Sequence, residues 1–143
     1  MGLPILALAA IAARAPLTPS KVDASTDLRA QGYGLGAMQQ APEGAIILTW
    51  QALDAFPLWY YHYALGIRPD VAIIVVPLMQ FDWYTEQLHI LYPDLALPTR
   101  EMLALDPSGW ASPPEFWKRP VCFPQLSTGQ APELQLVCPG ASE

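Results

Sequence analysis

The chain has 143 residues, of which 52% are hydrophobic and 14% are charged. Globular domains usually carry about 25% charged residues, so this composition excludes a disordered chain and predicts one domain with an apolar core. The net charge of −6 argues against a nucleic-acid partner, since binding phosphates requires a basic surface. The same charge argues against electrostatic docking on an anionic membrane.

The N-terminus opens with an apolar run, Gly2 to Ala13, which Arg14 closes. This run is shorter than the roughly 20 residues that a membrane-spanning helix needs, and no Lys or Arg precedes it as in a signal peptide. Three interpretations stay open: the end of a membrane helix, a degenerate signal peptide, or a short amphiphilic anchor. Residues 14–22 carry prolines and no periodicity, which predicts a linker before a domain at 23–143.

A weak helix is predicted at Leu28 to Gln40. Capping side chains precede it, at Asp23, Ser25 and Asp27. Three glycines interrupt it, at Gly32, Gly34 and Gly36. A dinucleotide-binding glycine loop needs a strand before it, and none precedes these glycines. We therefore interpret the segment as a loosely packed helix and predict no cofactor.

The clearest pattern is a strand–helix–strand unit. Ala45 to Trp50 and Val71 to Val76 are short, almost wholly apolar runs, typical of strands in a parallel sheet that is covered on both faces. Between them, Asp54 is placed to cap a helix from Ala55 to about Leu65, with Pro57 in its first turn.

The remaining part of the chain adds a helix and two candidate strands. Asp82 is placed to cap a helix from Trp83 to Leu91. Short apolar runs at Val121 to Phe123 and at Leu134 to Cys138 are candidate strands. The predicted fold class is α/β: a small, open, mainly parallel sheet of about four strands with covering helices.

Cys122 and Cys138 are the two cysteines of the chain. They fit either two buried thiols or a disulfide, which would need neighbouring strands and an oxidising compartment. The sequence has no CxxC pair and no histidine near them, and His62 and His89 are isolated. We therefore predict no metal site.

Candidate ligand-binding residues follow from a rule for open parallel sheets, whose ligands bind beyond the carboxyl ends of the strands. Aromatic rings stand there beside Asp54 and Asp82, a combination that suits a sugar. Each carboxylate also fits a helix cap, the aromatic rings also fit core contacts, and Arg68 also fits a turn pair with Asp70. The sequence has no nucleophile elbow or phosphate loop, so we name no catalytic residue. The candidates are Trp50, Asp54, Trp59, Tyr60, Arg68, Asp82, Trp83 and Tyr84.

The string from Asp54 to Leu88, DAFPLWYYHYALGIRPDVAIIVVPLMQFDWYTEQL, resembles the soluble C-terminal part of a polytopic bacterial membrane family. That family, known as a domain of unknown function, is similar to the transmembrane type of protein O-mannosyltransferases. The matching residues are Asp54 and 56–60, then Gly66, Arg68, Asp70 and Val71, then Trp83, Tyr84, Gln87 and Leu88. One departure lies just before Asp54, where Gln51, Ala52 and Leu53 replace an acidic residue and an asparagine of the family. Of the family's pair of acidic residues, this chain therefore keeps only Asp54.

The resemblance implies a function. In that family the catalytic carboxylate and the lipid-linked sugar donor lie in an early loop between membrane helices, which has no counterpart in these residues. Gly2 to Ala13 is then the stub of the last membrane helix. The chain is predicted to be a non-catalytic, membrane-associated accessory domain on the extracytoplasmic side of an O-mannosyltransferase-like protein.

The partners that the resemblance implies are a membrane-embedded glycosyltransferase domain or subunit and an acceptor polypeptide or glycan that the domain holds. Two alternatives stay open. One is a stand-alone α/β protein that binds a small ligand such as a sugar. The aromatic rings and carboxylates at the strand ends support this alternative. The other is a truncated fragment without a role of its own.

Overall fold

The computed structural model of the chain describes residues 27–98, 117–127 and 133–139. The apolar run at Gly2 to Ala13, the linker and the capping positions Asp23 and Ser25 lie outside these residues. The elements are α3 (Arg29–Gln40), β1 (Ile46–Thr49), α4 (Ala52–Trp59), the π-helical turn η2 (Tyr60–Ala64), β2 (Ala72–Val75), the 3-10 helix η3 (Val76–Gln80), α5 (Asp82–Leu91), β3 (Val121–Leu126) and β4 (Leu134–Val137).

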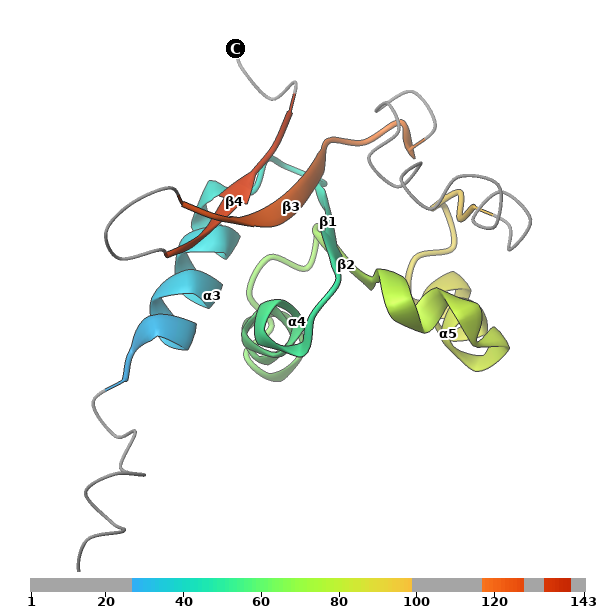
Figure 1. Cartoon of the computed structure of the whole chain (residues 1–143). Coiled ribbons are helices and arrows are strands. Elements are labelled where there is room, and N and C mark those ends of the chain that lie inside the picture. Colours follow the sequence, from blue (N-terminus) through green and yellow to red (C-terminus); the bar gives the residue numbers. More distant parts are fainter. Residues whose placement is uncertain (1–26, 99–116, 128–132, 140–143) are drawn as a thin grey trace, which may run out of the picture.

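The strands form one sheet in the order β2-β1-β3-β4. β1 pairs in parallel with both neighbours, so that Ile47 lies opposite Ile73 on one side and Cys122 on the other. β4 runs antiparallel to β3 and forms one edge of the sheet. The helices α3, α4 and α5 surround this sheet (Figure 1). The structure confirms the predicted α/β class with a small, open, mainly parallel sheet.

Both faces of the central strand are buried, because successive side chains of a strand point to opposite faces. Ile46 and Leu48 belong to the core cluster that contains Leu88 of α5. Ile47 belongs to the cluster that contains Met38 of α3. All five side chains are at most 1% exposed, and burying each one stabilises the fold by about 1.5–3 kcal/mol. The continuous apolar runs of the sequence are thus explained by a sheet that is covered on both sides.

The helix after β1 begins earlier than the sequence pattern predicts. It starts at Ala52, with Gln51 as the N-cap residue, so that Asp54 lies within the first turn and does not cap the helix from outside. Asp54 occupies the third helical position, from which a carboxylate reaches back to the N–H of the N-cap residue. The backbone N–H groups of Gln51 and Trp50 lower the pKa of this carboxylate, as expected for an acidic side chain that faces the start of a helix.

Pro57 consequently lies inside α4 and not in its first turn. It has no N–H to donate to the carbonyl of Leu53, four residues earlier. The helix then widens into the π-helical turn η2, in which the N–H of Leu65 donates to the carbonyl of Tyr60 at 3.1 Å. The helix after β2 also starts one residue early: Asp82 is the first residue of α5, and Phe81 is its N-cap.

A disulfide joins Cys122 of β3 to Cys138, the residue after β4. The antiparallel register pairs Phe123 with Val137, so the next pair along the ladder is Cys122 with Cys138. Their Cα atoms are 4.1 Å apart. Of the two interpretations that the sequence left open, the structure contains the disulfide, and it fastens the edge strand to the sheet.

Candidate functional site

The structure places the candidate residues in separate parts of the molecule and not in one mouth. Arg68 lies before β2, at the amino ends of the parallel strands, whereas the other candidates follow the carboxyl ends of β1 and β2. Among these, Asp54 is on the side of α3 and Tyr84 is in the core cluster of α5. Successive side chains of β1 point to opposite faces of the sheet, so the side of α3 and the side of α5 are two separate surfaces.

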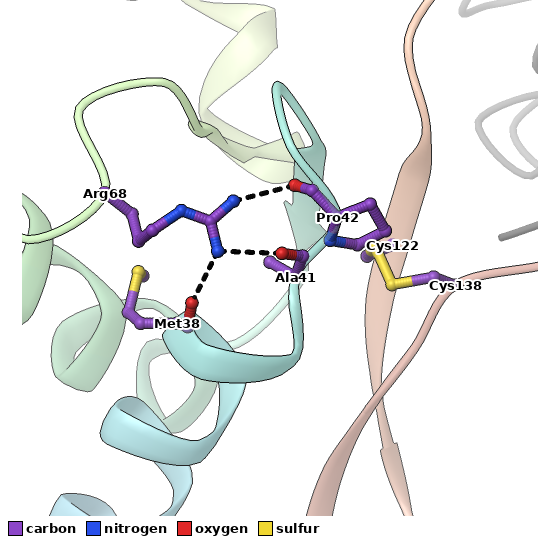
Figure 2. The surroundings of a disulfide bond; sticks show 6 residues. All are labelled: Met38, Ala41, Pro42, Arg68, Cys122 and Cys138. Atoms are coloured by element: carbon purple, nitrogen blue, oxygen red, sulfur yellow. Dashed lines mark hydrogen bonds between the residues drawn. A yellow bond between two sulfur atoms is a disulfide. The ribbon is translucent and has the colours of Figure 1, made fainter.

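Arg68 organises the turns at the amino ends of the strands. One guanidinium nitrogen, Nη1, donates to the carbonyls of Met38 and Ala41, both at 2.8 Å, and Nη2 donates to the carbonyl of Pro42 at 2.8 Å (Figure 2). Two of these carbonyls end α3, where a helix lacks its own donors. Nε and Nη2 also bond the carboxylate of Asp70 at 2.9 Å. The Nε, Nη1 and Nη2 groups of Arg68 therefore all donate hydrogen bonds within the fold.

Asp70 completes this network. Its carboxylate accepts the N–H of Gly44 at 2.9 Å, and its backbone carbonyl accepts from Arg119 at 2.6 Å. The Arg68 guanidinium holds the pKa of Asp70 well below its usual range. These contacts connect the turns before β1, β2 and β3, which gives the pair of Arg68 and Asp70 a structural role.

His62 is buried and takes part in a hydrogen-bonded chain. Its Nδ1 lies 3.1 Å from the carbonyl of Arg68, which can only accept, so we assign the proton to Nδ1. Nε2 then accepts from the hydroxyl of Tyr92 at 3.2 Å, and the Tyr92 oxygen accepts from Tyr63, also at 3.2 Å. The chain ties η2 to the end of α5.

The aromatic candidates divide into buried and exposed groups. Tyr84 is buried, and its hydroxyl oxygen accepts the N–H of Val75 at 2.8 Å. Trp59 is partly buried and packs against both core clusters. Trp50, Tyr60 and Trp83 are exposed, and the ring of Trp83 stacks on Phe81 with centroids 6.2 Å apart.

One side of α4 and η2 is apolar and exposed. Its residues are Leu53, Phe56, Tyr60 and Tyr63, and their spacing of three, four and three positions places them on one face of a helix. We call this set the α4 outer face. Exposed apolar sets of this kind often contact another protein or a membrane.

The described residues also form a hollow between α3, the first turn of α4 and the strand pair β3–β4. We call it the α3 hollow. Its volume of about 1370 Å³ exceeds the roughly 300–1,000 Å³ of typical small-molecule pockets. Residues that line it include Tyr33, Gln51, Asp54, Gln125, Leu126 and Leu134.

Tyr33 and Asp54 are the buried polar groups of the α3 hollow, each with 8% of its surface exposed. The hydroxyl of Tyr33 has no hydrogen-bond partner among the described residues. Burial and the nearby charge of Asp54 raise the pKa of Tyr33 far above its ordinary value. Burial also raises the pKa of Asp54, although backbone N–H groups of Gln51 and Trp50 oppose that shift.

Sequence reasoning found Asp54 but missed Tyr33. The only local signal is its position between Gly32 and Gly34. The residues that the structure describes contain no group of three or more His, Cys, Asp or Glu side chains that could hold a metal ion. Within the same residues, no helix has the length and hydropathy required to cross a membrane.

Comparison with known proteins finds relatives for part of the chain. Residues 30–99, from α3 to just beyond α5, match the family described as TMEM260-associated domain 2. The protein O-mannosyl-transferase TMEM260 of Mus musculus is 30% identical over 66 residues. This match covers 46% of the chain but 9% of the mouse protein. No solved structure matches the chain. The resemblance inferred from the string at Asp54 to Leu88 is thereby confirmed: the chain contains a domain that is related to the TMEM260 protein O-mannosyl-transferases.

Proposed function

We propose that this chain is a non-catalytic accessory domain of a membrane O-mannosyltransferase-like protein, placed on the extracytoplasmic side, where it holds the acceptor. The observation that carries the proposal is the match of residues 30–99 to a domain associated with TMEM260. The positions of the carboxylates support the accessory role. Asp54 lies in the α3 hollow and Asp82 begins α5 on a separate helix, so they do not form one acid–base pair.

The disulfide between Cys122 and Cys138 supports the extracytoplasmic placement. Disulfides persist in oxidising compartments and are rare in the reducing cytosol. A thiol-reactive polyethylene glycol maleimide, present while cells are lysed under denaturing conditions, should leave both cysteines unmodified until a reductant is added. Modification without a reductant would contradict the placement.

The α4 outer face supports a contact with a membrane-embedded transferase domain or subunit. Aromatic residues are enriched at protein interfaces and at membrane boundaries. Phe56 is 62% exposed there, and Ile90 on α5 is a similar apolar residue that is 74% exposed. These two positions form a matched pair for mutation, since replacing an exposed side chain leaves the core intact.

The experiment measures transfer of mannose from a lipid-linked donor to a threonine-containing peptide. Membranes from cells that lack this chain should lose activity, and the full chain should restore it, whereas the purified chain alone should yield no product. Phe56→Ser should fail to restore activity and Ile90→Ser should restore it. Product from the purified chain alone, or full activity of membranes without it, would refute the accessory role.

A further inference from the structure

We propose that the α4 outer face is a membrane-docking surface, which lies in the interface of a zwitterionic lipid bilayer. This inference deepens the proposed function, on which it rests for the presence of a membrane beside the domain. The helix would lie along the membrane plane, with its exposed apolar side chains between the lipid headgroups and the upper acyl chains. Docking there would hold the domain beside a transferase that is embedded in the same bilayer.

The first argument is the shape of the face. In Figure 1, α4 lies beside the sheet, and its inner flank carries Ala55 and Leu58, which are at most 2% exposed. On the outer flank, Leu53 is 78% exposed and Phe56 is 62% exposed. Because a helix rises about 1.5 Å per residue, the face from Leu53 to Tyr63 is about 15 Å long. A helix with one buried flank and one apolar, exposed flank is suited to lie flat in a membrane interface.

The second argument is the lack of charge around this face. From Ala45 to Ile67 the sequence contains one acidic or basic side chain, Asp54, and one histidine, His62. Both side chains belong to residues that are only 8% exposed, so this segment presents almost no charge to solvent. Protein interfaces are surrounded by a polar rim. An uncharged, apolar segment therefore favours lipid over a protein as the partner.

The residue types of the face also fit a bilayer interface. Leu53 and Phe56 are wholly apolar, whereas Tyr60 and Tyr63 each have an apolar ring with a hydroxyl at its tip. Tyrosine is enriched where membrane meets water, because its ring enters the apolar layer and its hydroxyl stays at the headgroups. The Tyr63 hydroxyl lies 3.2 Å from the hydroxyl of Tyr92. This polar group therefore keeps a hydrogen-bond partner when lipid displaces water.

The start of the chain provides a second attachment within reach of α4. Leu28, just before α3, and Leu53 of α4 line the same hollow, so the start of α3 and the first turn of α4 border one another there. The apolar run Gly2 to Ala13 precedes α3, and residues 14–26 span at most about 45 Å when fully extended. This reach exceeds the length of the α4 outer face. A run that enters the bilayer thus allows α4 to dock on the same surface, and two linked attachments bind more tightly than either alone.

The net charge selects the headgroup. The chain carries a net charge of −6, and the α4 outer face contains no lysine or arginine. An anionic membrane surface repels such a chain, because attraction to it requires basic side chains. A zwitterionic surface leaves the apolar contact unopposed. We therefore expect the domain to prefer phosphatidylcholine to phosphatidylserine.

The test is flotation of the full chain with phosphatidylcholine vesicles. Phe56→Ser should lower the partition coefficient at least fivefold, because a large apolar side chain no longer leaves water on docking. Ile90→Ser is the matched control, since Ile90 on α5 is 74% exposed and lies outside the α4 outer face. It should bind like the parent, and both variants should keep the parent Tm. Replacing half of the lipid by phosphatidylserine should weaken binding of the parent.

Hydrogen exchange measured by mass spectrometry locates the contact. Vesicles should slow the exchange of residues 52–65, and the exchange of β4 should stay unchanged. This measurement separates docking through α4 from attachment through Gly2 to Ala13 alone, since all variants retain that run. Binding to vesicles without slower exchange of residues 52–65 would overturn the inference.

The remaining contrary outcomes are distinct. Equal partition of Phe56→Ser and the parent, or stronger binding to vesicles with phosphatidylserine, would overturn docking through an apolar contact. If Phe56→Ser partitions like the parent but fails to restore mannose transfer, the face contacts a protein and this inference is wrong. A dimer of the parent without vesicles that Phe56→Ser dissociates would assign the face to a second copy of the chain and also overturn it.

Failure of the proposed function gives a different result. Phe56-dependent vesicle binding by a chain that does not restore mannose transfer to membranes would refute the accessory role and leave the docking surface standing. Restored transfer without Phe56-dependent vesicle binding would refute the docking surface and leave the accessory role standing.

Discussion

Arg68 shows how one side chain can determine several turns at once. Its φ angle of 55° is unusual for a residue with a Cβ, and the surrounding contacts hold it there. The planar guanidinium reaches the end of α3, the turn at Pro42 and the carboxylate of Asp70 simultaneously. A lysine has one nitrogen in place of this fork and cannot form the same set.

We therefore expect Arg68→Lys to lower the free energy of unfolding by about 2 kcal/mol, because partly buried carbonyls lose their donors. Urea denaturation measures this change. Arg29→Lys is the matched control, since Arg29 forms an ion pair with Asp27 in a position where its side chain is 88% exposed. Exposed pairs contribute little, and this variant should unfold like the parent. Equal effects of the two substitutions would contradict the structural role of Arg68.

Asp54 makes stability depend on pH in a defined direction. Burial raises its pKa in the folded chain above the ordinary value, so ionisation is less favourable in the folded than in the unfolded state. The contribution of this group is most favourable below the unfolded pKa near 4 and is lost as pH rises through the folded pKa.

Asp54→Asn should consequently be more stable than the parent at pH 7, and the difference should shrink as the pH is lowered toward 4. Thermal unfolding at several pH values measures the difference. A variant that is less stable at pH 7 would show instead that the favourable effect of the Gln51 and Trp50 N–H groups on the carboxylate outweighs the cost of burying its charge.

At the scale of elements, α3 combines a glycine that the fold needs with glycines that it does not. A Cβ at Gly34 would lie 2.7 Å from Tyr61 and 3.1 Å from the Cβ of Pro57, whereas Gly32 faces open space. The three glycines look alike in the sequence. Only the packing of α3 against α4 and η2 distinguishes them.

Substituting alanine at these two positions should have opposite effects. Gly34→Ala should lower the free energy of unfolding by about 1–3 kcal/mol through overpacking. Gly32→Ala should raise it by up to about 1 kcal/mol, because alanine favours the helix and restricts the unfolded chain. Urea titration of both variants measures the sign, and changes of the same sign would contradict the described packing.

At the scale of the whole molecule, the disulfide fastens β4 to the sheet. Cys122 and Cys138 are 16 positions apart, and closing a loop of this length stabilises a fold by about 3 kcal/mol. β4 is otherwise an edge strand with partly exposed side chains. The bond therefore adds to the packing of Leu134 and Leu136 against the core cluster that contains Met38 of α3.

Reduction with dithiothreitol should lower the Tm markedly, in line with a loss of about 3 kcal/mol. The double variant Cys122→Ser with Cys138→Ser should show the lower Tm from the start and should not respond to the reductant. Calorimetry with and without dithiothreitol measures both. A parent Tm that does not respond to complete reduction would show that β4 is held by other contacts.

The apolar runs determine much of this protein without any tertiary information. Two β-branched runs separated by a helix predict a parallel pair, and the structure confirms the strands, their sheet and the α/β class. These features are local because periodicity and strand propensity act over a few residues. The string from Asp54 to Leu88 is equally local and indicates the relation to O-mannosyltransferases.

The site depends on packing that no local pattern records. Tyr33 and Asp54 line the same hollow because α3 packs against α4, while Asp82 begins a helix whose Leu88 packs on the other face of the sheet. Arg68 bonds a carbonyl 30 positions away in the chain. Contacts of this kind depend on how whole helices pack against the sheet. Because the side chains of β1 alternate between its two faces, α3 and α5 pack on opposite sides. The sequence alone therefore determined the elements and the relation to O-mannosyltransferases, and the tertiary structure decided which polar groups line the hollow.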